Sequence, residues 1–396
     1  MRKQWAFWAM LVSLGGIVGA EEPRKVYVGD ALPFDQPPID YWSADSQDPV
    51  AELNRRLEKE QVGLEFSERF GYLPAVLKAL DVPVSSQLLR FQSGGLQRNI
   101  SRQRPRAFYF NDDVVVASSA QAEQLELAAQ DADKGTLFYT LKNRADAPPR
   151  FERSQKMVCL ACHNSDGWHH SNIGAPGHIV ASGVTIEEAR RFPLGGVVTH
   201  AMPIEFRWAG QYVSGLERRQ KHRGVTIDLK PEDEFESHQY LLGTSDAVAH
   251  LVSDHQMFGQ HLLSRLSYEH QLHVRSKVEL MTVRYLLLAD EAPFDHPISG
   301  KSEYADWYQA RGPKDANGRS LYDLDLKRRT FRYRISPLLQ SRMVQGFPPE
   351  LKTALFRRLN DTLTGREALK GYSISDEDRS ATLSVLRATV RDWPME

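Results

Sequence analysis

The chain contains only two cysteines, and they stand three positions apart immediately before a histidine, as Cys159, Cys162 and His163. Two cysteines are too few for a disulfide framework, so the burial of apolar side chains has to hold the fold together. With 396 residues, the chain is long enough to form one large hydrophobic core or two smaller ones.

The residues from Cys159 to His163 have the pattern Cys-x-x-Cys-His, and this spacing has a chemical reason. Two thiols three positions apart can add to the two vinyl groups of one haem, which fixes the ring against the backbone. The adjacent His163 then reaches the iron from one side. The sequence therefore predicts one covalently bound haem c on Cys159 and Cys162, with His163 as the proximal iron ligand.

Three other interpretations of the cysteine pair fit less well. A reducible Cys-x-x-Cys redox pair is expected in a thioredoxin-like βαβ unit, and the neighbouring sequence does not suggest one. A structural disulfide requires no histidine. A zinc site requires further ligands, and the chain has no third cysteine.

The sequence offers several candidates for the sixth iron ligand. His200 and Met202 precede Pro203, and a Met-Pro pair at this distance from the motif is typical of an electron-transfer cytochrome. His255 lies on the apolar face of a predicted helix, where a structural core histidine is the alternative interpretation. Three further histidines follow the motif closely, in a loop that we expect on the proximal side of the ring, which argues against them: His169, His170 and His178.

The first twenty residues have the parts of a secretory signal peptide. Arg2 and Lys3 are followed by the apolar run 5–18 and by Val18-Gly19-Ala20, a small-residue cleavage signal. We therefore expect a bacterial periplasmic protein, with an uncleaved N-terminal anchor as the alternative. The apolar run is short for a membrane span and no later run is longer, so the mature chain is expected to have no membrane span.

The charge balance favours no polyanionic partner. The whole chain has 50 Lys and Arg against 51 Asp and Glu, and removing Arg2 and Lys3 leaves 48 against 51, a net charge of −3. This balance argues against a nucleic-acid binder. Two basic stretches are interpreted as solvated loops, and binding of a haem propionate is the alternative for any one of their members: Arg98, Arg102, Arg104 and Arg106, and Arg218, Arg219, Lys221 and Arg223.

The expected fold class is α+β. After the signal peptide at 1–20, residues 21–47 are rich in proline and aspartate and are expected to form an extended lead-in. Residues 48–396 are expected to form one cytochrome c-like, haem-binding unit. Its expected parts are a small antiparallel β unit at about 105–142, a haem-attachment segment at about 150–215 and a mainly helical C-terminal part at about 238–392.

Local patterns predict the individual elements. Short β-rich runs separated by turn residues at 111–113 and 131–135 predict an antiparallel meander, closed by Pro148-Pro149, and Gly210 is expected at the turn of a hairpin joining 206–208 to 212–213. Helices are expected to begin at Asp48 and after Pro74, and Ser375 is expected to cap the last one. The remaining predicted helices span residues 246 to about 277, 279–288, 321–328, 350–363 and 376–390.

Most of the mature chain, roughly from Asp48 to Leu386, also resembles a family of exported bacterial proteins with a single-haem cytochrome c domain. The matching segments are Gly71–Pro74, Val82–Gln87, Pro105–Ala107, Tyr109–Val114, Gly135–Leu141, the Cys-x-x-Cys-His motif with Pro176-Gly177, Arg207–Val213, Asp290–Pro293 and Ala310–Pro313. The tryptophan-glycine-glycine of the family is Trp208-Ala209-Gly210 here, which is a conservative departure.

The resemblance implies haem binding and electron transfer to an unidentified redox partner protein. It also favours His200 as the sixth ligand, because that position is usually histidine in the family whereas the position of Met202 is usually not methionine. Two alternatives remain open. One is a peroxidase- or oxidase-like haem enzyme with an open iron position, for which Arg106, Asn111 and His255 would be the residues of interest. The other is a haem with a purely structural role.

Overall fold

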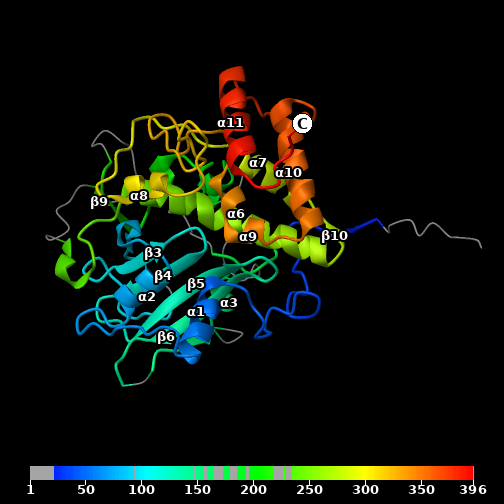
Figure 1. Ribbon diagram of the computed structural model, residues 1–396. Coiled ribbons are helices and arrows are strands. Elements are labelled where there is room, and N and C mark those ends of the chain that lie inside the picture. The colour runs from blue at the N-terminus through cyan, green and yellow to red at the C-terminus, as the bar shows by residue number, and fades with distance from the viewer. Residues whose placement is uncertain are drawn as a thin grey trace, which may run out of the picture.

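The computed structural model describes residues 22–92, 95–146, 148–154, 158–163, 173–178, 185–192, 196–216, 226–227 and 234–395. The predicted signal peptide lies outside the described residues. The fold is α+β, as predicted, with an antiparallel sheet in the N-terminal half and helices in the C-terminal half (Figure 1). None of the described helices is long and apolar enough to cross a membrane.

The main sheet has eight strands in the order β7-β6-β5-β4-β3-β2-β8-β9. The predicted meander is confirmed, since β3 to β7 are consecutive antiparallel neighbours. The sheet is larger than predicted, because it also takes in β2 and two short strands from beyond the cysteine motif. The strands are β2 Leu88–Arg90, β3 Arg106–Phe110, β4 Val114–Ser119, β5 Gln124–Asp131, β6 Gly135–Lys142, β7 Phe151–Arg153, β8 Gln211–Val213 and β9 Thr226–Ile227.

The predicted hairpin around Gly210 is wrong. Residues Ile204–Phe206 form a short 3₁₀ helix, η2, and β8 pairs with β2 instead of with 206–208. The physical reason is the side chain of Arg207, which donates to the carbonyls of Met202 at 2.6 Å and His200 at 2.9 Å. These two bonds fold the segment back on itself before the strand begins.

The lead-in, which was predicted to be extended, contains several turns and one short strand, β1 (Arg24–Lys25), which pairs in parallel with β10 (Val274–Arg275). It is nevertheless packed on the fold. Ile39 and Tyr41 are buried, and the Tyr41 hydroxyl donates to the Thr136 carbonyl at 2.8 Å.

Most of the predicted helices are present. The described helices are α1 Pro49–Glu58, α2 Leu73–Ala79, α3 Leu160–His163, α4 Ile186–Ala189, α6 Ala247–Gln271, α7 Val278–Leu286, α8 Tyr304–Ala310, α9 Arg342–Gln345, α10 Pro349–Thr364 and α11 Asp376–Thr389. The 3₁₀ turns besides η2 are η1 Val84–Ser86, η3 Ser237–Gln239 and η4 Pro337–Gln340.

Two helix predictions need correction. The helix expected to reach about residue 277 ends at Gln271, because the chain turns at His273 (φ 49°) and pairs as β10. The helix expected at 321–328 is absent, because the Asp325 carboxylate accepts from the backbone of Lys327 and Arg328 and stabilises a turn instead. The sequence also gave no indication of α8.

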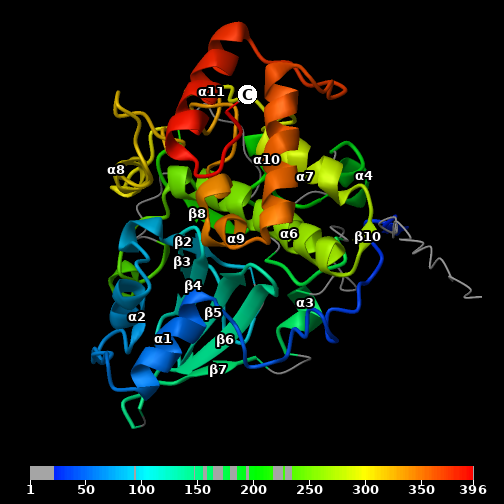
Figure 2. The same cartoon turned by 45° about the vertical axis from the view of Figure 1, so that its right-hand side comes forward.

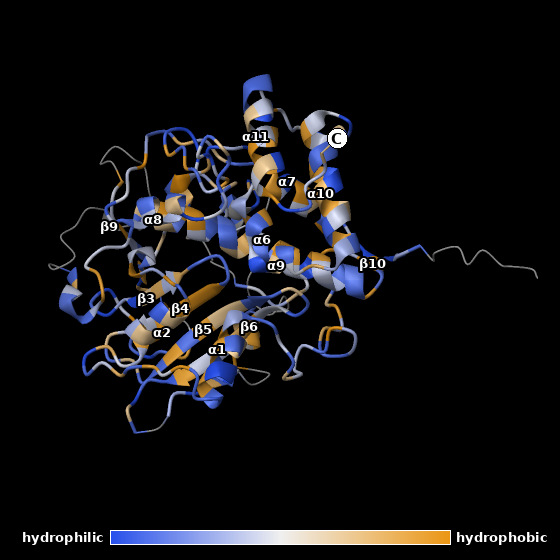
Figure 3. Cartoon of the chain, in the orientation of Figure 1, coloured by the Kyte–Doolittle hydropathy of each residue, from blue (hydrophilic) through white to orange (hydrophobic). Residues whose placement is uncertain are grey.

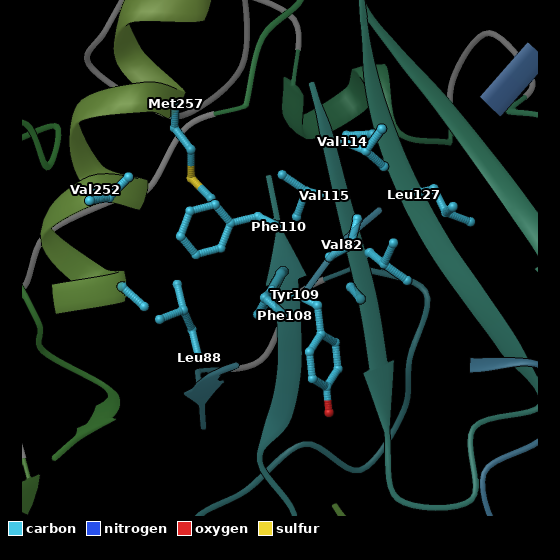
Figure 4. Packing of buried hydrophobic residues seen from close by; sticks show 14 of the residues in the cluster. Val82, Leu88, Phe108, Tyr109, Phe110, Val114, Val115, Leu127, Val252 and Met257 are labelled. Carbon is cyan, nitrogen blue, oxygen red and sulfur yellow. The ribbon is translucent and has the colours of Figure 1, made fainter. Parts of the chain in front are cut away.

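Helix α6 runs between the sheet and the C-terminal helices (Figures 1 and 2). Every residue from Ala247 to Glu269 is buried. On its sheet side, Phe110 points toward Met257, whereas Tyr109 points to the other face of the sheet, where α1 and α2 pack (Figure 4). On its other side lies a second hydrophobic cluster formed with α7, α10 and α11, and hydrophobic and hydrophilic residues alternate along α10 and α11 (Figure 3).

Asp48 joins α1 to the sheet with one buried carboxylate. Its Oδ1 accepts from the backbone of Val50 at 2.9 Å and Ala51 at 3.0 Å, which caps the helix, and its Oδ2 accepts from the Tyr139 hydroxyl at 2.6 Å. Ser375 caps α11 in the same way through the backbone of Asp378, as predicted, but its side chain is exposed.

This difference between the two caps can be measured by urea unfolding. Asp48→Ala is expected to cost about 2–4 kcal/mol, because it removes a cap and leaves a buried hydroxyl without its acceptor. Ser375→Ala removes only a cap and is expected to cost about 1 kcal/mol. Equal losses in the two variants would show that the bond to Tyr139 does not contribute.

Candidate haem site

The cysteine motif begins at Cys159 and continues through α3 (Leu160–His163), a single helical turn that follows β7. The amides of Cys162 and His163 both donate to the Cys159 carbonyl, at 3.1 and 3.0 Å. One helical turn places residues three positions apart on the same side, so the backbone directs the two thiols to a common edge. Cys159 is partly buried, Cys162 is exposed, and both are free thiols.

The surroundings of Cys159 differ from those of a thiol–disulfide exchange site. Burial raises the pKa of the Cys159 thiol, whereas a reactive redox cysteine has a lowered pKa. The strand before α3 belongs to an antiparallel meander and not to a βαβ unit. Among the described residues, no group of three or more His, Cys, Asp or Glu side chains is arranged to hold a metal ion.

The ring of His163 is held in one tautomer. Its Nδ1 lies 3.1 Å from the Gly177 carbonyl, which can only accept, so Nδ1 carries the proton and the lone pair of the neutral ring is on Nε2. The ring packs on Phe138 of β6, with centroids 4.8 Å apart. A histidine whose Nδ1 donates to a backbone carbonyl has the form in which imidazoles bind metals through Nε2.

The Gly177 carbonyl belongs to residues 173–178, which we call the strap. Helix α6 fixes the strap through two buried side chains. The His261 Nε2 donates to the Ala175 carbonyl at 2.8 Å, and the Arg265 Nη1 donates to the carbonyls of Ile173 and Gly174 at 3.0 and 3.1 Å. The strap in turn fixes His163, so α6 determines the position of the predicted iron ligand.

The strands that face His163 carry charged side chains. The strand register places Phe138, Glu126, Arg106 and Arg90 on one face of the sheet, and Arg106 and Glu126 form a part-buried ion pair at 2.7 Å. The face is thus apolar beneath His163 and charged toward β2 and β3.

No protein-family model, curated protein or solved structure matches this chain. The resemblance to haem proteins therefore stays a prediction, and a haem site has to be inferred from the residues of this chain alone.

His178, at the end of the strap, lies beside His163, with ring centroids 5.4 Å apart. Burial, and the charges of His163, Arg90 and Arg106, lower the pKa of His178 well below 6.5, so its ring is neutral at pH 7. Because His178 directly follows Gly177, it lies near the Nδ1 side of His163. His169 and His170 lie outside the described residues.

The structure brings two of the predicted sixth-ligand candidates together. The Nδ1 atoms of His200 and His255 are 2.7 Å apart, and the Nε2 of His255 lies 2.7 Å from the Ser336 Oγ. Both histidines are buried, and burial lowers both pKa values, that of His255 to about 3. The Nε2 of His200 has no hydrogen-bond partner in the described part of the chain, and His200 lines a cavity of about 190 Å³ beside Tyr285.

His200 and His163 belong to different surroundings. His163 is grouped with the strap and His261, and His200 is grouped with His255. Since His255 and His261 are six residues apart in α6, they are separated by about 9 Å along the axis and by about 120° around it. Met202 is buried, and its carbonyl accepts from Arg207.

Asn111, one of the residues of interest for a haem enzyme with an open iron position, has a structural role. Its Oδ1 accepts from the backbone of Asp113 and Val114 in the β3–β4 turn, and its Nδ2 donates to the Leu80 and Asp81 carbonyls. His261 and Arg265 were not among the site residues predicted from the sequence. Their spacing of four residues in a predicted apolar helix could have indicated a supporting role, because polar side chains on a buried face have to find hydrogen-bond partners.

The contact between the strap and α6 predicts the effect of a methyl group at Gly177. A Cβ at this position would lie 2.3 Å from the His261 ring, so Gly177→Ala is expected to displace the strap and to cost about 1–3 kcal/mol in urea unfolding. Gly63→Ala is the matched control, because nothing lies within 4 Å of a Cβ there. A Gly177→Ala variant as stable as this control would contradict the tight contact.

Proposed function

We propose that this chain is a c-type cytochrome that carries one haem on Cys159 and Cys162 and transfers electrons in the bacterial cell envelope. The observation that carries the proposal is the hydrogen bond from His163 to Gly177. The residue directly after the second thiol is held in the tautomer that an iron ligand requires, by a backbone carbonyl that α6 fixes in place.

The haem would supply a one-electron iron couple, and the chain's residues would adjust it. Cys159 and Cys162 would hold the ring, and His163 would bind the iron through Nε2. The bond to Gly177 would make the imidazole a more basic ligand, which would favour oxidised iron and lower the reduction potential of a bound haem. Export is part of the proposal, because the predicted signal peptide directs the chain to the compartment where bacteria attach haem to such motifs.

His200 stays the predicted sixth ligand, with Met202 and His255 as alternatives. The hydrogen-bond chain gives His200 a suitable tautomer when His255 donates to Ser336 and accepts from His200. In this arrangement the lone pair of His200 is on Nε2. An electron carrier with a six-coordinate iron follows if this nitrogen binds the metal.

The haem itself is tested by expressing the chain in a bacterium that matures c-type cytochromes. The purified protein is expected to be red, and its mass is expected to exceed the peptide mass by one haem. His163→Gly is expected to lose the normal spectrum of the reduced protein, whereas His178→Ala, the matched control at a neighbouring histidine, keeps it. A colourless protein at its peptide mass, in cells that load another c-type cytochrome, overturns the proposal.

The sixth ligand is tested by spectra of the oxidised and reduced forms. A wild-type iron that is low-spin and does not bind carbon monoxide supports the electron carrier. His200→Ala is then expected to give a high-spin iron that binds carbon monoxide, whereas His255→Ala and Met202→Leu keep the low-spin iron. A wild-type protein that binds carbon monoxide readily would favour the haem-enzyme alternative instead.

A further inference from the structure

A row of three polar side chains crosses the face of the sheet beside the strap. Arg106 of β3 is paired directly with Arg90 of β2, and Arg90 is paired directly with Gln211 of β8. Directly paired residues point to the same face of a sheet. Both guanidinium groups lie over the Phe108 ring, at 4.7 Å for Arg90 and 4.8 Å for Arg106.

Arg90 and Gln211 are buried without hydrogen bonds at most of their polar atoms. The exposed fraction is 9% for Arg90 and 1% for Gln211. The Nε and Nη2 of Arg90, and both amide atoms of Gln211, find no partner within the described part of the chain. A buried donor without an acceptor costs about 1–3 kcal/mol, and more when it is charged. Such a pair indicates a partner group that the described part of the chain does not supply.

The charges nearby do not balance. Among the described residues, the guanidinium groups of Arg90, Arg106 and Arg207 have three carboxylates near them, and one of these, Glu291, is shared with a further arginine, Arg334. Glu126 is bonded to Arg106, and Asp254 accepts from Trp208 and lies 3.9 Å from Arg207. Burial lowers the pKa of Arg90 to about 10, so Arg90 stays charged at neutral pH. Two like charges directly opposite one another in a sheet are unfavourable, and an added anion would relieve the repulsion.

The row also has a suitable position relative to the cysteine motif. His163 packs on Phe138, and the same face of the sheet continues from Phe138 through Glu126 and Arg106 to Arg90. Gln211 lies two strands beyond Arg106, about 10 Å further across the sheet. In a haem, the propionates are on the edge opposite the vinyl groups, so a ring that is attached at Cys159 and lies along this face would have its propionates near Arg90 and Gln211.

We propose that Arg90 and Gln211 form the binding site for a haem propionate. This inference rests on the proposed covalent haem. The Arg90 guanidinium donates to the carboxylate through Nε and Nη2, a fork that matches carboxylate geometry, and the Gln211 amide donates one further hydrogen bond. The sequence analysis considered Arg106 for this role, but Arg106 is already paired with Glu126.

The test compares variants of the haem-loaded protein. Arg90→Gln removes the charge, Arg90→Lys keeps the charge but loses the fork, and Gln211→Leu removes only the amide. Arg150→Gln is the matched control, because it removes one positive charge from an exposed ion pair with Glu58. The measurements are the haem content, the reduction potential and the redox-induced infrared difference bands of the propionates.

Haem content is expected to be unchanged in all four variants, because the thioethers hold the ring. Arg90→Gln is expected to lower the reduction potential, since a nearby cation favours the reduced iron, and Arg90→Lys is expected to restore most of it. The propionate bands are expected to shift in Arg90→Gln and in Gln211→Leu, and to stay in place in Arg150→Gln. Should Arg90→Gln fail to fold, the band shift in Gln211→Leu decides.

Three outcomes separate the two proposals. Wild-type protein without haem overturns the proposed function. Haem-loaded protein whose potential and propionate bands are the same with and without Arg90 and Gln211 overturns this inference and leaves the haem assignment intact. Acetate is the last probe. If it raises the melting temperature of haem-loaded wild type but not of Arg90→Gln, the site binds a free carboxylate, and this inference is overturned.

Discussion

The candidate site depends on hydrogen bonds that α6 makes to segments without regular structure. His261 and Arg265 hold the strap, Gln260 donates to the Asp112 carbonyl, and Ser267 and Tyr268 donate to the carbonyls of the β5–β6 turn. Each bond contributes only about 0.5–1.5 kcal/mol net, but leaving its buried acceptor unpaired costs more. The polar residues of this buried helix therefore determine where the neighbouring chain can lie.

The orientation of α6 separates the proposed proximal iron ligand from the proposed sixth ligand. His261 and His255 point in directions about 120° apart, so the helix supports the surroundings of His163 with one side and those of His200 with another. If His200 binds the iron, the haem ring would have to extend past the side of α6 that carries Phe258 and Leu262 to meet the His200 imidazole. If it does not, the His200–His255–Ser336 chain is a separate buried polar network next to its own cavity.

The parts that could be predicted from the sequence are those set by neighbouring residues. The Cys-x-x-Cys-His motif, the meander with its turn residues, and the caps at Asp48 and Ser375 all depend on short stretches. The errors have non-local causes. Nothing near Gln211 shows that it pairs with Arg90. Likewise, hydrogen bonds made by the side chains of Arg207 and Asp325 stabilise other backbone conformations where local propensity favours a strand and a helix.

A haem bound at the motif would need support from beyond α3 and the strap. Helix α3 is one turn long and the strap has no regular structure, so neither can hold a cofactor by itself. Support has to come from elsewhere: the sheet supplies the apolar surface at Phe138 and the charged row through Arg90, and α6 supplies the bonds to the strap. Because the sheet and α6 are held in place by the two hydrophobic clusters, a haem bound as proposed would be supported by most of the fold.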